Sequence, residues 1–136
     1  MSTPHTIAEY IKQAEHNAEF AQYIRDKRSQ YIDWSVTCLF YAAVHFVNAY
    51  FEKFGIPIPR RHRGDLGAPG RTNIVQSDPQ LSAIYPEYRH LDDESRDARY
   101  ELRRISEGDY DNFLRPLLDK ISNFILPKVT NSDDMN

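Results

Sequence analysis

The sequence predicts an all-α protein: an antiparallel four-helix bundle with one long loop between the second and third helices. Apolar residues recur at helical spacing through most of the chain. Four of the five glycines fall between residues 55 and 71, and Gly108 marks a further break. A chain of 136 residues with 40% hydrophobic residues suffices for one core and is too short for two ordinary domains. We therefore expect a single domain over residues 1–127 and a disordered C-terminal tail over residues 128–136.

The first predicted helix begins after Thr3 or Thr6, either of which can cap it, and runs to about Lys27. A short turn at residues 28–30 leads into the second helix, so the two are expected to form an antiparallel hairpin. The inner face of the first helix carries three alanines that let a neighbour approach closely, and consists of Ile7, Ile11, Ala14, Ala18, Ala21 and Ile24.

The second predicted helix, residues 31–54, has two faces that could each make contacts. At about 100° per residue, the apolar face holds Ile32, Val36, Leu39, Phe40, Ala43, Val47, Tyr50 and Phe54. The opposite face holds Trp34, Cys38, Tyr41, His45, Asn48 and Glu52. A helix on the outside of a small domain needs only one apolar stripe, so the second face predicts a further contact.

After Gly55, Pro57 and Pro59 prevent the second helix from continuing. The third helix is expected to begin near Thr72 or at Gln80, and Pro86 must kink or restart it. Its apolar face is predicted to consist of Tyr88, Leu91, Ser95, Ala98, Leu102 and Ile105, with Gly108 as its end.

The last predicted helix has the clearest amphipathic pattern in the chain. Asp109 or Asp111 is its expected cap, Pro116 disturbs its first turns and Pro127 ends it. The predicted inner face consists of Tyr110, Phe113, Leu114, Leu117, Leu118, Ile121 and Ile125.

Composition excludes several classes of protein. A net charge of −3 argues against nucleic-acid binding by bulk charge, so such binding would need a local basic patch. The single cysteine, Cys38, cannot form an internal disulfide, which fits a reducing cytoplasm. We expect a soluble cytoplasmic protein, because the first residues lack the pattern of a secretory signal and no run of 18 apolar residues occurs.

The predicted loop holds the strongest candidate for a binding site, a basic patch formed by Arg60, Arg61, His62, Arg63 and Arg71. Planar guanidinium groups suit phosphate oxygens, and glycines let a backbone come close to a ligand. This chemistry predicts contact with RNA or nucleotide phosphate. The alternative is a solvated basic loop that balances the acidic helices.

Two helical positions are further candidates. His45, one turn after Tyr41, could act as an acid/base or contact RNA, since histidine titrates near neutral pH. The alternative is an interface histidine that is hydrogen-bonded to a tyrosine or a carboxylate. On the third helix, Arg99 lies at the apolar stripe and requires an acceptor, whereas Arg96 fits a solvated face.

No metal site or cofactor is predicted. Metal sites in helical bundles use paired Glu-x-x-His motifs, and here that spacing occurs once, from Glu87 to His90. The glycine-rich loop also lacks the ending of a phosphate-binding P-loop.

Three segments together resemble the HEPN superfamily: FYAAVHFVNAYFEKFG, RRHRG and YRHLDDESRDARYE. The resemblance covers about residues 30–105 and implies a short helical bundle that is commonly homodimeric. Many HEPN proteins are metal-independent ribonucleases of toxin–antitoxin and antiviral defence systems, and others are non-catalytic partners of nucleotidyltransferases. The ribonucleases use an arginine followed four to six residues later by histidine, and this chain departs from that pattern at all five of its histidines.

Two hypotheses follow from the resemblance. The favoured one is a non-catalytic homodimeric module that binds RNA, a nucleotide or a protein partner of a prokaryotic defence or toxin–antitoxin system. In it the ligand contacts are Arg61, Arg63, Arg71, Arg96 and Tyr41, and Trp34 and Tyr41 lie at the dimer interface. The alternative is a variant metal-independent endoribonuclease, with His62 or His45 as acid/base and Arg63, Arg71 or Arg99 stabilising the phosphorane.

Overall fold

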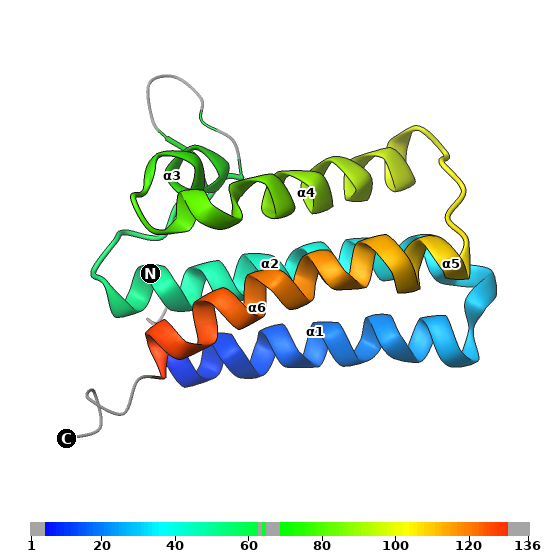
Figure 1. The fold of residues 1–136 in the computed structure, drawn as a ribbon, viewed down its shortest axis with the longest axis horizontal. Coiled ribbons are helices and arrows are strands. Elements are labelled where there is room, and N and C mark those ends of the chain that lie inside the picture. The colour runs from blue at the N-terminus through cyan, green and yellow to red at the C-terminus, as the bar shows by residue number, and fades with distance from the viewer. Residues whose placement is uncertain (1–4, 63, 65–68, 131–136) are drawn as a thin grey trace.

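The computed structural model describes residues 5–62, 64 and 69–130, and no strand occurs among them. The elements are α1 (Ile7–Lys27), η1 (Ser29–Tyr31), α2 (Ile32–Lys53), α3 (Arg71–Ser77), η2 (Leu81–Ile84), α4 (Tyr85–Tyr100), α5 (Glu107–Asp109), η3 (Tyr110–Leu114) and α6 (Arg115–Val129). The long helices α1, α2, α4 and α6 lie side by side (Figure 1). The predicted all-α class is therefore confirmed for the described residues. Within the described ranges, every helix is too short or too polar to cross a membrane.

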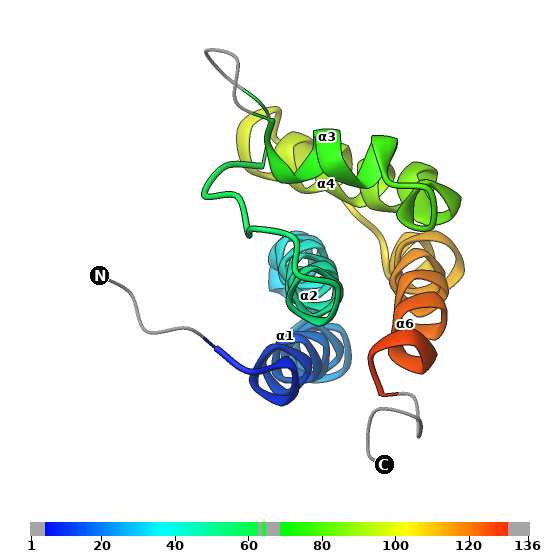
Figure 2. The ribbon, with the colours of Figure 1, turned by 90° about the vertical axis from the view of Figure 1, so that its left-hand side faces the viewer.

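Helix α2 is the centre of the fold. It packs against α1, α4 and α6, and Figure 2 shows it between α1 and α4 with α6 to one side. The predicted apolar face of α2 is buried, except that Phe54 lies past the end of the helix and is exposed. Gly55 ends the helix with a φ of 68°, a conformation that glycine adopts without strain.

Helix α1 begins where a capping box stabilises it. The Thr6 side chain accepts a hydrogen bond from Glu9 N at 3.1 Å, and Thr6 N donates to Glu9 Oε1 at 2.9 Å. Ala14, Ala18 and Ala21 are buried, and α1 makes its most extensive packing with α2. The prediction of a close α1–α2 contact over small residues is confirmed.

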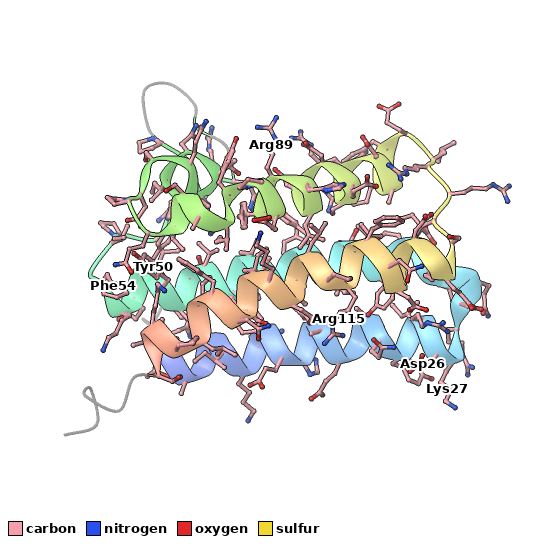
Figure 3. The ribbon with its side chains drawn as sticks, viewed as in Figure 1. Asp26, Lys27, Tyr50, Phe54, Arg89 and Arg115 are labelled. Carbon is pink, nitrogen blue, oxygen red and sulfur yellow. The ribbon has the colours of Figure 1, made fainter. Side chains whose placement is uncertain are left out.

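A partly buried hydrogen bond connects the end of α2 to the segment after α3. Tyr50 donates from its hydroxyl to Asp78 Oδ2 at 2.9 Å, and Figure 3 marks Tyr50 at this end of the bundle. The same carboxylate accepts from Gln80 N and Leu81 N, both at 3.0 Å, and so caps η2. Pro86 lies in the first turn of α4. Backbone N–H groups in the first turn of a helix have no partner within the helix, so the proline removes no hydrogen bond there. A helix therefore restarts at this proline, as predicted.

The predicted end of the third helix is wrong. Helix α4 ends at Tyr100, because Leu102 has a φ of 55° and turns the chain away. Leu102 is 84% exposed and does not belong to the apolar face, whereas Ile105 reaches the core from the connecting segment. Gly108 lies inside α5, whose cap is Ser106 rather than Asp109 or Asp111.

The last helix also departs from the prediction in two places. Residues 110–114 form a π-turn ahead of Pro116, which shifts the helical phase, and Phe113 is 64% exposed. Pro127 lies within α6, and the helix continues to the buried Val129. The prediction that Pro127 ends the last helix is therefore wrong. Residues 131–136 of the predicted tail lie outside the described residues.

Candidate functional site

The segment between α2 and α3 is held in place by two consecutive backbone hydrogen bonds. Arg71 N donates to Arg61 O at 2.9 Å, and Thr72 N donates to His62 O at 2.7 Å. The chain before α3 therefore runs against the first residues of that helix. This pairing fixes the backbone of His62 beside the start of α3.

The side chain of Arg71 joins three parts of the fold. It is 5% exposed, and its Nε donates to Asn48 Oδ1 on α2 at 3.0 Å. Its Nη2 donates to Pro59 O at 2.9 Å, and its Nη1 lies 3.0 Å from His62 Nδ1. The structure thus places Arg71, a predicted phosphate contact, in the interior, where its guanidinium bonds to protein groups.

The contact with Arg71 decides the tautomer of His62. A guanidinium has five N–H donors and no acceptor, so His62 Nδ1 must accept the hydrogen bond. The neutral imidazole therefore carries its proton on Nε2. Burial lowers the pKa of His62, and the positive charge of Arg71 lowers it further. His62 is therefore neutral at pH 7.

The His62 ring packs on α2, beside the buried Phe40 and the exposed Tyr41. Its ring centroid is 5.2 Å from that of Phe40 and 5.9 Å from that of Tyr41. From α4, the charge of Asp92 raises the pKa of His62, and the charges of Arg99 and Arg96 lower it by smaller amounts. His62 therefore contacts both α2 and Arg71.

His45 lies one helical turn after Tyr41 and is half-buried. Burial lowers its pKa, and the charges of Arg71 and His5 lower it further. Its Nδ1 is buried and has no hydrogen-bond partner among the residues that the structure describes. A buried N–H without an acceptor is rarer than a buried acceptor without a donor. This favours the same tautomer as in His62, with the proton on Nε2.

The predicted arginines differ in their surroundings. Arg61 and Arg96 are exposed, whereas Arg99 is half-buried with its Cζ 5.3 Å from the centroid of the Tyr100 ring. Arg99 Nε is buried and makes no hydrogen bond within the described part of the chain. Nearby, Ser95 donates to Thr37 Oγ1 at 3.4 Å and joins α4 to α2. Arg63 lies outside the described residues.

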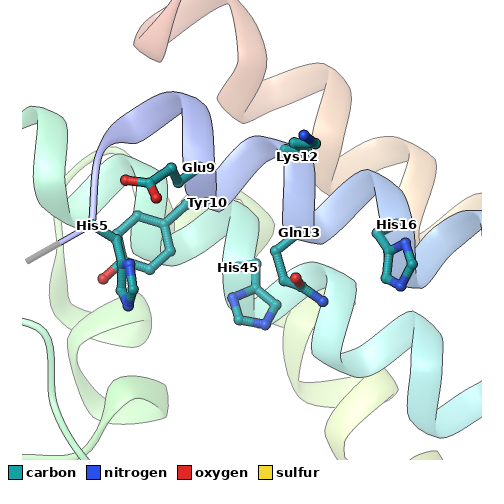
Figure 4. Close-up of a pocket in the computed structure, with 7 residues that line it drawn as sticks. All are labelled: His5, Glu9, Tyr10, Lys12, Gln13, His16 and His45. Carbon is teal, nitrogen blue, oxygen red and sulfur yellow. The ribbon is translucent and has the colours of Figure 1, made fainter. Parts of the chain in front are cut away.

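A cavity of about 610 Å³ opens on the other side of His45, between α1 and α2. Figure 4 shows the side chains that line it: His5, Glu9, Tyr10, Lys12, Gln13, His16 and His45. Sequence reasoning assigned a role only to His45. The others were missed because they share a surface with His45 only after the α1–α2 hairpin has formed.

In residues 5–62, 64 and 69–130, no group of three or more side chains is placed to hold a metal ion. Comparisons of the chain with protein-family models, with curated proteins and with solved structures found no match.

Proposed function

We propose that this chain is a HEPN-like antiparallel four-helix module that forms a homodimer and binds single-stranded RNA on the outer face of α2. We name this surface the α2 face and define it as Tyr41, His45, His62, Arg61 and Arg96. The resemblance of residues 30–105 to HEPN proteins supports the proposal, as does the observed helical bundle. Like other such modules, it would act in a prokaryotic defence or toxin–antitoxin system, with a nucleotidyltransferase-type or other protein partner.

The observation that carries the proposal is the hydrogen bond between Arg71 and His62. With Nδ1 occupied, the remaining nitrogen of His62 is an N–H donor, which suits a phosphodiester oxygen or a base carbonyl. Arg96 lies close enough to His62 for its charge to lower the pKa of that imidazole, and Arg61, the residue before His62, is exposed; both side chains carry guanidinium donors. Arg61 and Arg96 carry the positive charge that this face offers to an RNA backbone, and Arg96 shares its surface with Asp93, Asp97 and Glu101.

Tyr41 supplies the aromatic part of a single-strand site. It is 38% exposed, and its ring packs edge-on against His62. Single-stranded nucleic acids bind where bases stack on aromatic rings beside a basic groove. The α2 face therefore combines both elements without any base-specific geometry.

A homodimer is supported by aromatic side chains at the hairpin end of α1 and α2. Phe20, Tyr23, Tyr31 and Trp34 are all about half-exposed, and we name them the hairpin aromatics. Phe20 and Tyr23 stack with ring centroids 6.3 Å apart, and exposed aromatic rings of this kind are enriched at protein interfaces. This interface would lie next to the α2 face and leave Tyr41 accessible to RNA.

The alternative function is a metal-independent endoribonuclease, and the tautomers argue against it. Cleavage by 2′-OH attack needs a general base with an accessible lone pair. The Nδ1 of His62 accepts from Arg71, and the Nδ1 of His45 is buried. Both imidazoles therefore offer donors, which suit binding better than proton abstraction.

The experiment is a titration of fluorescein-labelled 12-nucleotide oligouridine by fluorescence anisotropy, in EDTA and at several salt concentrations. Arg61→Ala and Arg96→Ala are compared with Lys128→Ala, which removes one charge from α6, away from the α2 face. Each arginine variant is expected to weaken binding and to reduce the slope of log K against log salt by about 0.7.

Equal loss in Lys128→Ala, or no RNA binding by the wild type, would contradict the proposal. A denaturing gel of the same samples tests the alternative, since RNA cut in EDTA would establish the ribonuclease.

A further inference from the structure

The cavity between α1 and α2 is not used by the proposed RNA contacts except at His45. Figure 4 shows His5 and Tyr10 at one end, His45 and Gln13 in the middle and His16 at the other end. Its volume of about 610 Å³ lies within the usual range for small-molecule sites. The cavity is therefore large enough to hold one nucleotide.

Flat rings make up one part of the lining. The ring centroids of Tyr10 and His45 are 6.4 Å apart, and the two planes are 25° from parallel. His5 meets Tyr10 edge-on, with centroids 5.6 Å apart. Tyr10 comes from the first turn of α1 and His45 from the middle of α2, so the hairpin brings two similarly oriented rings to one surface. Such rings offer stacking faces to a planar heterocycle.

Polar groups that match the edge of a base make up the rest. Gln13 donates from Nε2 to Asn17 Oδ1 at 3.2 Å, which leaves its carbonyl oxygen as an acceptor and its second N–H as a donor. Lys12 contributes an ammonium group. Among the described residues of the lining, Glu9 is the one carboxylate, and it accepts from Thr6 N in the capping box. The tyrosine, histidine and glutamine side chains offer both donors and acceptors, which suits the edge of a base.

We propose that this cavity holds one nucleotide of the bound RNA strand, with its base against the ring of Tyr10 and its edge at Gln13. The strand then passes His45 and continues to Tyr41, one helical turn or about 6 Å further along α2. Lys12 and His16 lie where they can contact a phosphate. This inference rests on the proposed RNA function and names a part of its site that lies on α1.

The test separates a free nucleotide from a nucleotide within RNA. Uridine 5′-monophosphate, inorganic phosphate and 12-nucleotide oligouridine are titrated into the wild type, Tyr10→Leu, Gln13→Ala and Arg61→Ala. Tyr10→Leu keeps apolar bulk but removes the flat ring, and Gln13→Ala changes an exposed side chain that the fold does not need. Phe113→Ala is the matched control, because it removes an exposed ring far from the cavity in the sequence and on another element.

We expect Tyr10→Leu and Gln13→Ala each to weaken binding of the mononucleotide and of oligouridine. For Tyr10→Leu, which removes the ring, the expected loss in affinity is about tenfold. Arg61→Ala should weaken oligouridine alone, and inorganic phosphate should bind poorly to every protein. If oligouridine binding depends on Arg61 but is unchanged in both cavity variants, the cavity proposal is overturned and the RNA function stands. If the mononucleotide binds at Tyr10 and oligouridine does not bind, the cavity is a nucleotide site and the RNA function is overturned.

Discussion

Arg71 Nη1 lies 3.0 Å from His62 Nδ1, and this contact makes the imidazole an acceptor on its inner side and a donor on its outer side. The same guanidinium bonds to Asn48 of α2 and to the carbonyl of Pro59. One buried cation therefore connects the central helix, the segment after it and the start of α3. The conformation of the α2 face depends on it.

We predict that His62 and His45 remain neutral at pH 7 as Nε2–H tautomers. Burial lowers the pKa of both, followed by the charge of Arg71, so each should titrate below the usual value of about 6.5. Two-bond ¹H–¹⁵N correlation spectra report tautomer and titration midpoint directly. Removal of the charge in Arg71→Met should raise the pKa of His62, and a proton on Nδ1 at neutral pH in the wild type would contradict the assignment.

The same shifts predict how stability depends on pH. Each histidine binds its proton less well in the folded state, so stability is full above pH 6.5 and falls as the pH decreases through the folded pKa values. Urea unfolding at pH 7.5 and 5.5 measures the loss. The double variant His45→Gln/His62→Gln should show a smaller difference between the two pH values, and an unchanged difference would assign the loss to other groups.

Loss of Arg71 should destabilise the domain more than loss of any exposed arginine. Arg71→Met keeps most of the volume but leaves Asn48 Oδ1 and Pro59 O without their donor, and we expect a loss of about 3 kcal/mol in the free energy of unfolding. Arg96→Met, on an exposed position of α4, is the control and should change stability by less than about 0.5 kcal/mol. Urea denaturation of the wild type, Arg71→Met and Arg96→Met measures these changes in the free energy of unfolding. Equal changes in the two variants would contradict a structural role for Arg71.

Arg25 connects α1 to the start of the last helical stretch. Its Nε and Nη2 donate to Asp111 at 2.9 and 2.7 Å, and Nη1 lies 3.5 Å from Glu107 Oε2. Hydrogen bonding to Arg25 lowers the pKa of Asp111, so its contribution is present above about pH 4 and disappears as the pH falls below that. Asp111→Asn should therefore lower the Tm at pH 7 and leave it nearly unchanged at pH 3.

Asp119→Asn is the matched control for this pair. Asp119 bonds to Arg115 within α6 at 3.1 Å and joins no two elements. At pH 7, Asp119→Asn should lower the Tm less than Asp111→Asn does. Equal effects would mean that the connection between elements adds nothing to stability.

The hairpin aromatics predict the oligomeric state. If they form the homodimer interface, Trp34→Ser combined with Phe20→Ser should convert a dimer into a monomer in light scattering coupled to size exclusion. Phe113→Ser removes an equally exposed ring from η3 and should leave the dimer intact. A wild-type monomer at micromolar concentration would contradict this interface.

The helices could be predicted from the sequence because each buries one regular apolar stripe, as with Ala14, Ala18 and Ala21 of α1. Their ends could not, since Pro127 removes one hydrogen bond without stopping α6 and the π-turn before Pro116 rotates Phe113 outward. The basic residues of the loop were recognised as a group. The interior position of Arg71 was not, because it depends on Asn48, which lies 23 residues earlier and belongs to a different element. Arg71 differs from the exposed Arg61 and Arg96 in its hydrogen bonds to other parts of the fold, which cannot be read from the sequence.

Leu102 offers a test of the turn that ends α4. It has a φ of 55° and is 84% exposed, so its side chain gains little from packing while its backbone occupies the left-handed region. A non-glycine residue in that region costs about 1–2 kcal/mol of conformational free energy. Glycine avoids this cost, but it loses more conformational entropy on folding, which offsets about 0.5–1 kcal/mol of the gain. Leu102→Gly should therefore stabilise the domain by about 0.5–1 kcal/mol in urea denaturation. Leu102→Ala removes the same exposed side chain without relieving the backbone and should give no gain. If alanine stabilises as much as glycine, the effect comes from the exposed leucine side chain and not from the conformation at residue 102.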